Sequence, residues 1–296
     1  MKKRVILFIS FIVLIAIISI IISYFFIIGA ESKPTKELEQ ICNINKKEYN
    51  NRKVFTITPK KNVKEKNDTT IFYLHGGSYM AEMTKEHWNF IKDIAKDTGA
   101  TIIVPDYPLT PKYDYNDVFN FILPLYKKVI TNINTNNLIM MGDSAGGGMA
   151  LALCEKLGEE NIDMPSKLLL ISPWLDISLK NERIDEVQKV DDVLNKDTLK
   201  LAGLVYAKDT EVDNYLVSPL YGQLNKLQNV SIYTGTYDIL NPDVDILVDK
   251  AKDVNVEITV NEYKHKKHNW IITTNDRRIE QGYLDIIQEI NNYFSN

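Results

Sequence analysis

A serine flanked by glycines lies near the middle of the chain, where its type and spacing suggest nucleophilic chemistry. The stretch Gly142-Asp143-Ser144-Ala145-Gly146 directly follows the apolar run Leu138-Ile139-Met140-Met141. An apolar strand, a sharp glycine turn with a serine at its tip and a following helix form a nucleophile elbow, which holds the serine exposed on a strained backbone. This pattern predicts that the Ser144 hydroxyl attacks an electrophilic carbon, such as that of an acyl group.

A serine hydroxyl becomes an effective nucleophile only when a base takes its proton and a third group orients that base. The chain has four histidines. His75 lies in a glycine turn before the serine, and His87 is predicted to be solvated on the exposed side of an amphipathic helix. The candidates for the base are therefore His265 and His268, which follow a strand predicted over residues 256–260.

Two aspartates are candidates for the orienting acid. Asp238 follows the apolar run at residues 230–233, and Asp243 lies at the start of the next predicted helix. Loops at the carboxyl ends of parallel strands gather at one edge of a sheet, so Asp238 should reach the edge that carries Ser144. Asp243 stays a second candidate, although a carboxylate at a helix start is stabilised by the helix dipole anyway. The order Ser144, Asp238, His268 is the chain order of the α/β-hydrolases.

The third part of such a site is a set of donors for a developing oxyanion. His75-Gly76-Gly77 comes directly after a strand predicted over residues 69–74. The backbone N–H groups of Gly76 and Gly77, together with that of Ala145, are predicted to form this oxyanion hole. A plain glycine turn would also account for the two glycines, but not for their occurrence together with the elbow.

Strands and helices alternate along most of the chain. Six apolar or β-branched runs are predicted to be strands, at residues 69–74, 100–104, 138–141, 167–171, 230–233 and 256–260. Helical segments separate most of them, which predicts an α/β fold with a mostly parallel sheet covered by helices. Residues 54–58 alternate and end at a proline, as an edge strand would. The interruption at residues 175–229 is predicted to be an inserted cap.

The amino terminus has the pattern of a membrane anchor. Met1-Lys2-Lys3-Arg4 precedes the uncharged residues 5–28, which as a helix would be about 36 Å long and could cross a bilayer core of about 30 Å. A cleaved signal peptide is the alternative, although the bulky Ile28 precedes Ala30 where a small residue is usual. We therefore expect an anchor over residues 1–30, with residues 31–296 outside the cell membrane.

Composition excludes other classes of protein. The net charge is −4, and no aromatic-plus-basic pattern indicates nucleic-acid binding. Cys42 and Cys154 are too few for a disulfide framework, so both are predicted to be free, inert thiols rather than bridged. The sequence does not indicate an oligomeric state.

From about residue 69 to residue 294, the chain resembles the hormone-sensitive-lipase branch of the α/β-hydrolase esterases. Seven segments are similar to motifs of that family: His75–Tyr79, Tyr107–Pro111, Gly142–Gly147, Ser172–Asp176, Ser218–Leu220, Gly235–Leu240 and Tyr263–Trp270. Three positions depart from the family pattern. Ser78 replaces the third glycine of the first motif, Lys112 stands where a glutamate usually follows the second, and Asn269-Trp270 replaces Gly-Phe in the last.

This resemblance implies an α/β-hydrolase fold with a helical cap built from about residues 31–50 and 175–229. It implies Ser144, Asp238 and His268 as the catalytic residues, with His268 favoured over His265. The expected activity is hydrolysis of short- to medium-acyl esters by a Ser-His-Asp triad, with no cofactor and no metal. Members with an amino-terminal anchor act on lipophilic compounds, so the substrate is expected to be a small, membrane-soluble ester.

Two other functions would fit the same fold. One is a catalytically inactive relative that binds a small ligand under the cap, but such relatives usually lose the histidine. The other is a peptidase, for which the chain has no substrate-filtering domain.

Overall fold

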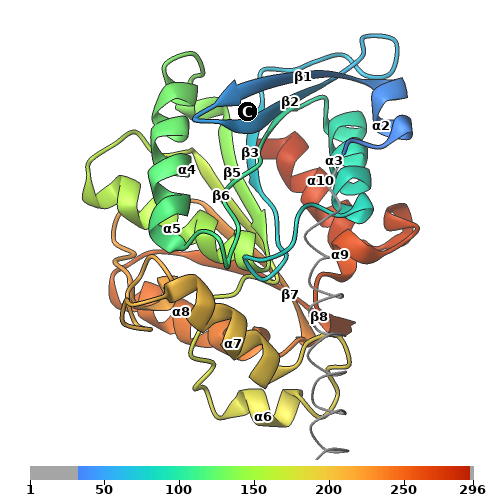
Figure 1. Ribbon diagram of the computed structural model, residues 1–296. Helices are drawn as coiled ribbons and strands as arrows, with labels where there is room; N and C mark the ends of the chain where they lie inside the picture. Colours follow the sequence, from blue (N-terminus) through green and yellow to red (C-terminus); the bar gives the residue numbers. More distant parts are fainter. Residues whose placement is uncertain (1–32, 294–296) are drawn as a thin grey trace, which may run out of the picture.

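The computed structural model describes residues 33–293, and its strands form one eight-stranded sheet (Figure 1). The sheet order is β1-β2-β4-β3-β5-β6-β7-β8. All neighbours from β4 to β8 pair in parallel, whereas β2 pairs antiparallel with both β1 and β4. The mostly parallel sheet predicted from the sequence is therefore confirmed. The strands are β1 (Cys42–Tyr49), β2 (Arg52–Pro59), β3 (Thr70–Leu74), β4 (Thr101–Pro105), β5 (Leu138–Asp143), β6 (Lys167–Ile171), β7 (Val230–Tyr237) and β8 (Ile258–Lys267).

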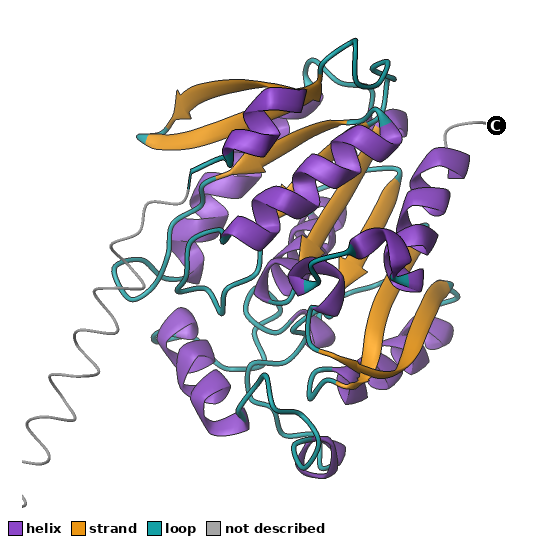
Figure 2. Ribbon diagram, turned by 90° about the vertical axis from the view of Figure 1, so that its right-hand side faces the viewer, coloured by secondary structure: helices purple, strands orange, loops and turns teal. Residues whose placement is uncertain are grey.

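Each face of the sheet has its own core, because successive side chains of a strand point to opposite faces. Phe72 and Met140 belong to one cluster, and Tyr73 and Met141 to the other. Helices α4 and α5 cover the first face and α3 and α10 the second (Figures 1 and 2). The helices are α2 (Lys36–Ile41), α3 (Lys85–Thr98), α4 (Tyr115–Ile130), α5 (Ala145–Glu159), α6 (Arg183–Val187), α7 (Lys196–Ala207), α8 (Asn241–Asp253), α9 (Trp270–Thr273) and α10 (Gln281–Tyr293), with the 3-10 turns η1 (Thr135–Asn137), η2 (Pro219–Tyr221) and η3 (Arg277–Ile279).

The segment before β2 differs from the prediction. Residues 42–49, expected within a cap segment at 31–50, form edge strand β1 and pair with β2 along their whole length. The two strands are joined by Asn50 and Asn51, whose φ angles are 46° and 59°. Two consecutive residues with positive φ form the hairpin turn that matches strand twist, and asparagine tolerates that conformation. The Asn-Asn pair is thus the local reason for a hairpin here.

The insertion between β6 and β7 contacts the turn that follows β3. Its helix α7 supplies Tyr206, whose ring stacks on that of Tyr79 at 3.6 Å between centroids. Trp174, at the start of the insertion, stacks against the same Tyr79 ring at 5.2 Å. The insertion therefore packs directly on the glycine turn that is predicted from the sequence to supply oxyanion donors.

Two predictions concern the ends and the thiols of the chain. Cys42 and Cys154 are both buried and free, as predicted. Within residues 33–293, no helix is long and apolar enough to cross a membrane. The anchor predicted over residues 1–30 lies outside the described residues.

Candidate active site

Ser144 occupies a strained elbow between β5 and α5. Its φ and ψ are 52° and −123°, a backbone conformation that non-glycine residues rarely adopt and that costs of order 1–3 kcal/mol. Glycines on either side allow the tight approach. A Cβ on Gly142 would lie 2.3 Å from the Gly146 carbonyl oxygen, and one on Gly146 would lie 2.1 Å from that of Leu74. The Ser144 N–H donates to the Ile171 carbonyl at 2.9 Å, which fixes the elbow to β6.

The three side chains predicted to act together are in contact. His268 Nε2 lies 2.9 Å from Ser144 Oγ, and His268 Nδ1 lies 2.9 Å from Asp238 Oδ2. All three are buried, with 4%, 7% and 0% of Ser144, His268 and Asp238 exposed. With the proton on Nδ1, the ring donates to Asp238 and its Nε2 accepts from the serine hydroxyl. The Leu240 N–H donates to Asp238 Oδ1 at 3.0 Å and so orients the carboxylate.

The electrostatic surroundings favour a protonated imidazole. Burial lowers the pKa of His268, but the charge of Asp238 and its hydrogen bond outweigh this effect, with smaller contributions from Asp143 and Asp191. The pKa of His268 is therefore raised above its ordinary value. A ring held in this way can accept a proton from a neighbouring hydroxyl and remain stabilised as an imidazolium.

The competing residues lie elsewhere. His265 is exposed, and its backbone N–H donates to Thr236 Oγ1 at 2.8 Å. Asp243 accepts from Asn181 Nδ2 at 2.9 Å. Burial raises the pKa of Asp243 to about 6. The structure therefore brings Asp238 and His268 to Ser144, and neither Asp243 nor His265.

One predicted oxyanion donor is already occupied, which corrects the prediction for Gly76. The Gly76 N–H donates to Asp143 Oδ1 at 3.0 Å and cannot also hold a substrate oxygen. Within residues 33–293, no acceptor is hydrogen-bonded to the backbone N–H groups of Gly77, Ser78 or Ala145. The turn places Gly77 and Ser78 at φ angles of 123° and 54°. Among the described residues, the N–H groups of Gly77, Ser78 and Ala145 thus have no protein acceptor, whereas that of Gly76 does.

Asp143 connects the loops around Ser144. Its buried carboxylate accepts from Tyr73 Oη at 2.5 Å, from the Gly76 N–H at 3.0 Å and from Asn269 Nδ2 at 2.6 Å. His87 Nε2 lies 3.3 Å from the same group. Burial alone would raise the pKa of Asp143, but His87 foremost, and then Tyr73 and His75, hold it at about 2. One ionised carboxylate therefore binds the glycine turn, the elbow and the residue after His268.

The prediction for His87 is wrong, because its side chain is buried rather than solvated. His87 Nδ1 accepts from the Thr84 N–H at 3.0 Å in a capping box at the start of α3. The spacing of His87 in the sequence does indicate that its side chain is buried. His87 lies four and seven residues before the buried Ile91 and Ile94, on the same face of the helix.

His75 stabilises the other side of the glycine turn. Its ring stacks on that of Tyr107 with 4.4 Å between centroids, and Tyr107 Oη donates to the His75 carbonyl at 2.7 Å. Burial lowers the pKa of His75 to about 3, so the ring is neutral and acts as a packing group. Within residues 33–293, no cluster of three or more His, Cys, Asp or Glu side chains could hold a metal ion.

Comparison with known proteins agrees with this geometry. A family model described as the alpha/beta hydrolase fold matches residues 71–272, more than half of the chain. An esterase from Acinetobacter venetianus is 32% identical over 191 residues, which cover 64% of this chain and 63% of the relative. A triacylglycerol lipase from Mycobacterium tuberculosis is 29% identical over 227 residues, covering 76% of this chain and 46% of the relative. The chain thus spans between about half and two thirds of the length of these relatives.

A solved structure has the same fold. The crystal structure of a candidate esterase from Staphylococcus aureus superposes with a TM-score of 0.82 at 24% identity, covering 90% of this chain and 88% of that one. The resemblance to α/β-hydrolase esterases is confirmed at the level of the family. The chain belongs to the α/β-hydrolase fold family.

Proposed function

We propose that the protein is a serine carboxylic ester hydrolase that acts on short- to medium-acyl esters through an acyl-enzyme. The observation that carries the proposal is a chain of two hydrogen bonds among three buried side chains. His268 Nε2 lies 2.9 Å from Ser144 Oγ, and His268 Nδ1 lies 2.9 Å from Asp238 Oδ2. Relatives named esterase and triacylglycerol lipase support this class of reaction. The triad of Ser144, Asp238 and His268 is the proposed catalytic machinery.

In the first half of the reaction, His268 Nε2 takes the hydroxyl proton as Ser144 Oγ bonds to the ester carbonyl carbon. The carbonyl oxygen becomes an oxyanion, which the N–H groups of Gly77, Ser78 and Ala145 stabilise by hydrogen bonds. Asp238 stabilises the imidazolium without taking its proton. The carbon–oxygen bond to the alcohol then breaks, and His268 gives its proton to the leaving alkoxide.

In the second half, water replaces the alcohol. His268 takes a proton from the water, whose oxygen bonds to the acyl carbon, and the same donors hold the second oxyanion. Breakage of the bond to Ser144 Oγ releases the carboxylic acid, and the serine recovers its proton from His268. The enzyme is thereby regenerated with no cofactor in the cycle.

We also propose that residues 175–229 act as the cap, since Tyr206 of α7 stacks on Tyr79 of the glycine turn.

The uncharged residues 5–28 support a cell-membrane anchor over residues 1–30, with the catalytic domain outside. Amino-terminal sequencing of the protein from the membrane fraction tests the anchor. The intact amino terminus is expected, and a chain beginning near residue 31 would show that the segment is cleaved.

A series of p-nitrophenyl esters from two to twelve carbons tests the acyl preference. We expect kcat/KM to be highest for acyl groups of at most about eight carbons, the range implied by the esterase family whose motifs the sequence resembles. Rates are followed by release of p-nitrophenol at fixed pH. A maximum at ten or twelve carbons would contradict the short- to medium-acyl assignment, and no turnover of any ester would contradict the hydrolase assignment.

A further inference from the structure

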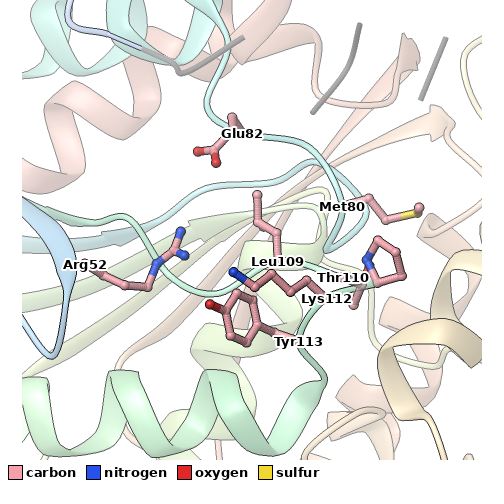
Figure 3. A pocket seen from close by; sticks show the side chains of 8 residues that line it. Arg52, Met80, Glu82, Leu109, Thr110, Lys112 and Tyr113 are labelled. Carbon is pink, nitrogen blue, oxygen red and sulfur yellow. The ribbon is translucent and has the colours of Figure 1, made fainter. Parts of the chain in front are cut away.

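A cavity of about 360 Å³ lies beside the glycine turn (Figure 3). Part of its wall is apolar, from Met80 and Leu109. Pro111 adds to this apolar part, and the other lining residues carry charge or a hydroxyl: Arg52, Glu82, Thr110, Lys112 and Tyr113. A mostly apolar cavity with a few convergent polar groups is the usual form of a site that binds part of a small molecule.

The cavity is connected to the proposed oxyanion donors through the backbone. The Met80 N–H donates to the Gly77 carbonyl at 3.0 Å, so Met80 lies one tight turn from the Gly77 amide. The Thr110 N–H donates to the Tyr79 carbonyl at 2.9 Å, which attaches the loop after β4 to the same turn. Three residues of chain span at most about 11 Å, and this turn is shorter. The Gly77 N–H therefore lies within about 11 Å of the Met80 backbone, which forms part of the cavity wall.

Two cations from different elements converge on one ring in this cavity. Lys112 Nζ lies 5.0 Å from the centre of the Tyr113 ring, and Arg52 Cζ lies 5.9 Å from it. Figure 3 shows the tips of Arg52 and Lys112 on the same side of the cavity as the Tyr113 hydroxyl. Together they present a guanidinium, an ammonium and a phenol as donors. This donor set suits a carboxylate.

The balance of charge around the cavity is positive. Arg52 Nη2 pairs with Asp106 Oδ1 at 2.9 Å, which compensates the guanidinium. Within residues 33–293, no carboxylate lies within ion-pair distance of Lys112. Burial and the neighbouring Asp106 raise the pKa of Glu82 to about 7, against the opposite effect of Arg52 and Lys53. Near pH 7 Glu82 is about half-ionised, so the lining carries a net positive charge of less than one unit, which grows as Glu82 is protonated and which favours an anion.

We propose that this cavity binds a carboxylate at the far end of the acyl or alcohol part of the substrate, so that the preferred esters are carboxylate-bearing. The inference rests on the proposed function and names its substrate class. Lys112 stands where the resembling family usually has glutamate. The charge at this position is therefore opposite to that of the family pattern.

Two pairs of esters test the proposal on the full chain. On the acyl side, monoethyl adipate is compared with ethyl hexanoate, and on the alcohol side 6-acetoxyhexanoate is compared with hexyl acetate. Each pair exchanges a terminal methyl group for a carboxylate, and hydrolysis is followed by pH-stat titration. We expect kcat/KM of the carboxylate ester to exceed that of its neutral partner by about tenfold in one pair, the size of one charged hydrogen bond.

The Lys112→Met variant removes the charge of the side chain and shortens it by one atom. It is expected to reduce that preference by about tenfold while leaving hydrolysis of the neutral ester unchanged. Lys61→Met, at an exposed lysine outside the cavity, is the matched control and should keep the preference. As the pH rises through about 7, ionisation of Glu82 should weaken the preference. Glu82→Gln should remove this decline.

Two outcomes would overturn the proposal. One is a carboxylate ester that is hydrolysed no faster than its neutral partner in both pairs. The other is a preference that Lys112→Met leaves unchanged. Absence of turnover for p-nitrophenyl butyrate and for every ester of the two pairs would overturn the proposed function itself, and this inference with it.

Discussion

Replacement of Ser144 by alanine is expected to lower kcat for p-nitrophenyl butyrate by at least about 10⁴-fold, because the acyl-enzyme can no longer form. The fold should persist, since alanine removes only the hydroxyl and the strained backbone is held by the Ser144 N–H on Ile171. The same variant should lose covalent labelling by a serine-directed phosphonate. Steady-state rates and a thermal melt of the purified variant measure the two effects.

His265→Ala is the matched control for the histidine. Its side chain is exposed and lies outside the triad, so the variant should keep activity within about twofold, as surface substitutions usually do. His268→Ala, in contrast, should lose nearly as much as Ser144→Ala, since the two groups act as a unit. Retention of more than a few per cent of activity in Ser144→Ala would mean that another group is the nucleophile.

The second large loss of activity is expected for the Asp143→Asn variant. The carboxylate accepts from Tyr73 and Gly76 on one oxygen and contacts Asn269 and His87 through the other. An amide can accept at only one of these positions, and its NH₂ group faces donors at the other. The glycine turn and the loop after His268 should then lose their common support. We expect kcat to fall by about 10²-fold, the size of losing one oxyanion donor.

The pH profile of Asp143→Asn distinguishes an electrostatic role from a structural one. His268 acts as a base only when neutral, and its raised pKa sets the acidic limb of kcat/KM above the ordinary histidine value of 6.5. Asp238, Asp143 and Asp191 all contribute negative charge to this shift. Loss of the Asp143 charge lowers the pKa of His268, so the limb should move to lower pH.

Tyr73→Phe is the control, because it removes one hydrogen bond to the same carboxylate and leaves the charge. It should reduce kcat by less than Asp143→Asn and leave the acidic limb in place. A folded Asp143→Asn variant with kcat within threefold of the original chain and an unmoved limb would show that Asp143 has neither role.

Ser144 and Asp238 were predictable because each lies just beyond a strand with a clear apolar pattern, whereas β8, which precedes His268, is apolar only in its first residues. The strands bring Ser144, Asp238 and His268 to the same edge of the sheet whatever the details of the loops. The choice of His268 over His265, however, depended on the family resemblance, because both residues are close in sequence to the strand end. β8 runs to Lys267, so His265 lies within the strand and His268 just beyond it.

The contacts of Asp143 and Gly76 could not be predicted in the same way. A sequence pattern gives the position of a backbone N–H but not which acceptor reaches it. The Asp143 carboxylate that accepts from the Gly76 N–H lies 67 residues later in the chain, so no local pattern indicates that this N–H is already hydrogen-bonded. The β1–β2 hairpin was missed for a different reason, since β1 has few apolar residues and its signal is the asparagine pair in the turn.

The central claim is that Ser144 Oγ, activated by His268, forms a covalent bond to the acyl carbon. Mass spectrometry of the chain after reaction with a fluorophosphonate tests it most directly. The account predicts one phosphonyl group per chain, on the peptide that contains Ser144, and much slower labelling of His268→Ala. An unlabelled chain, or a label on any other peptide, would contradict it.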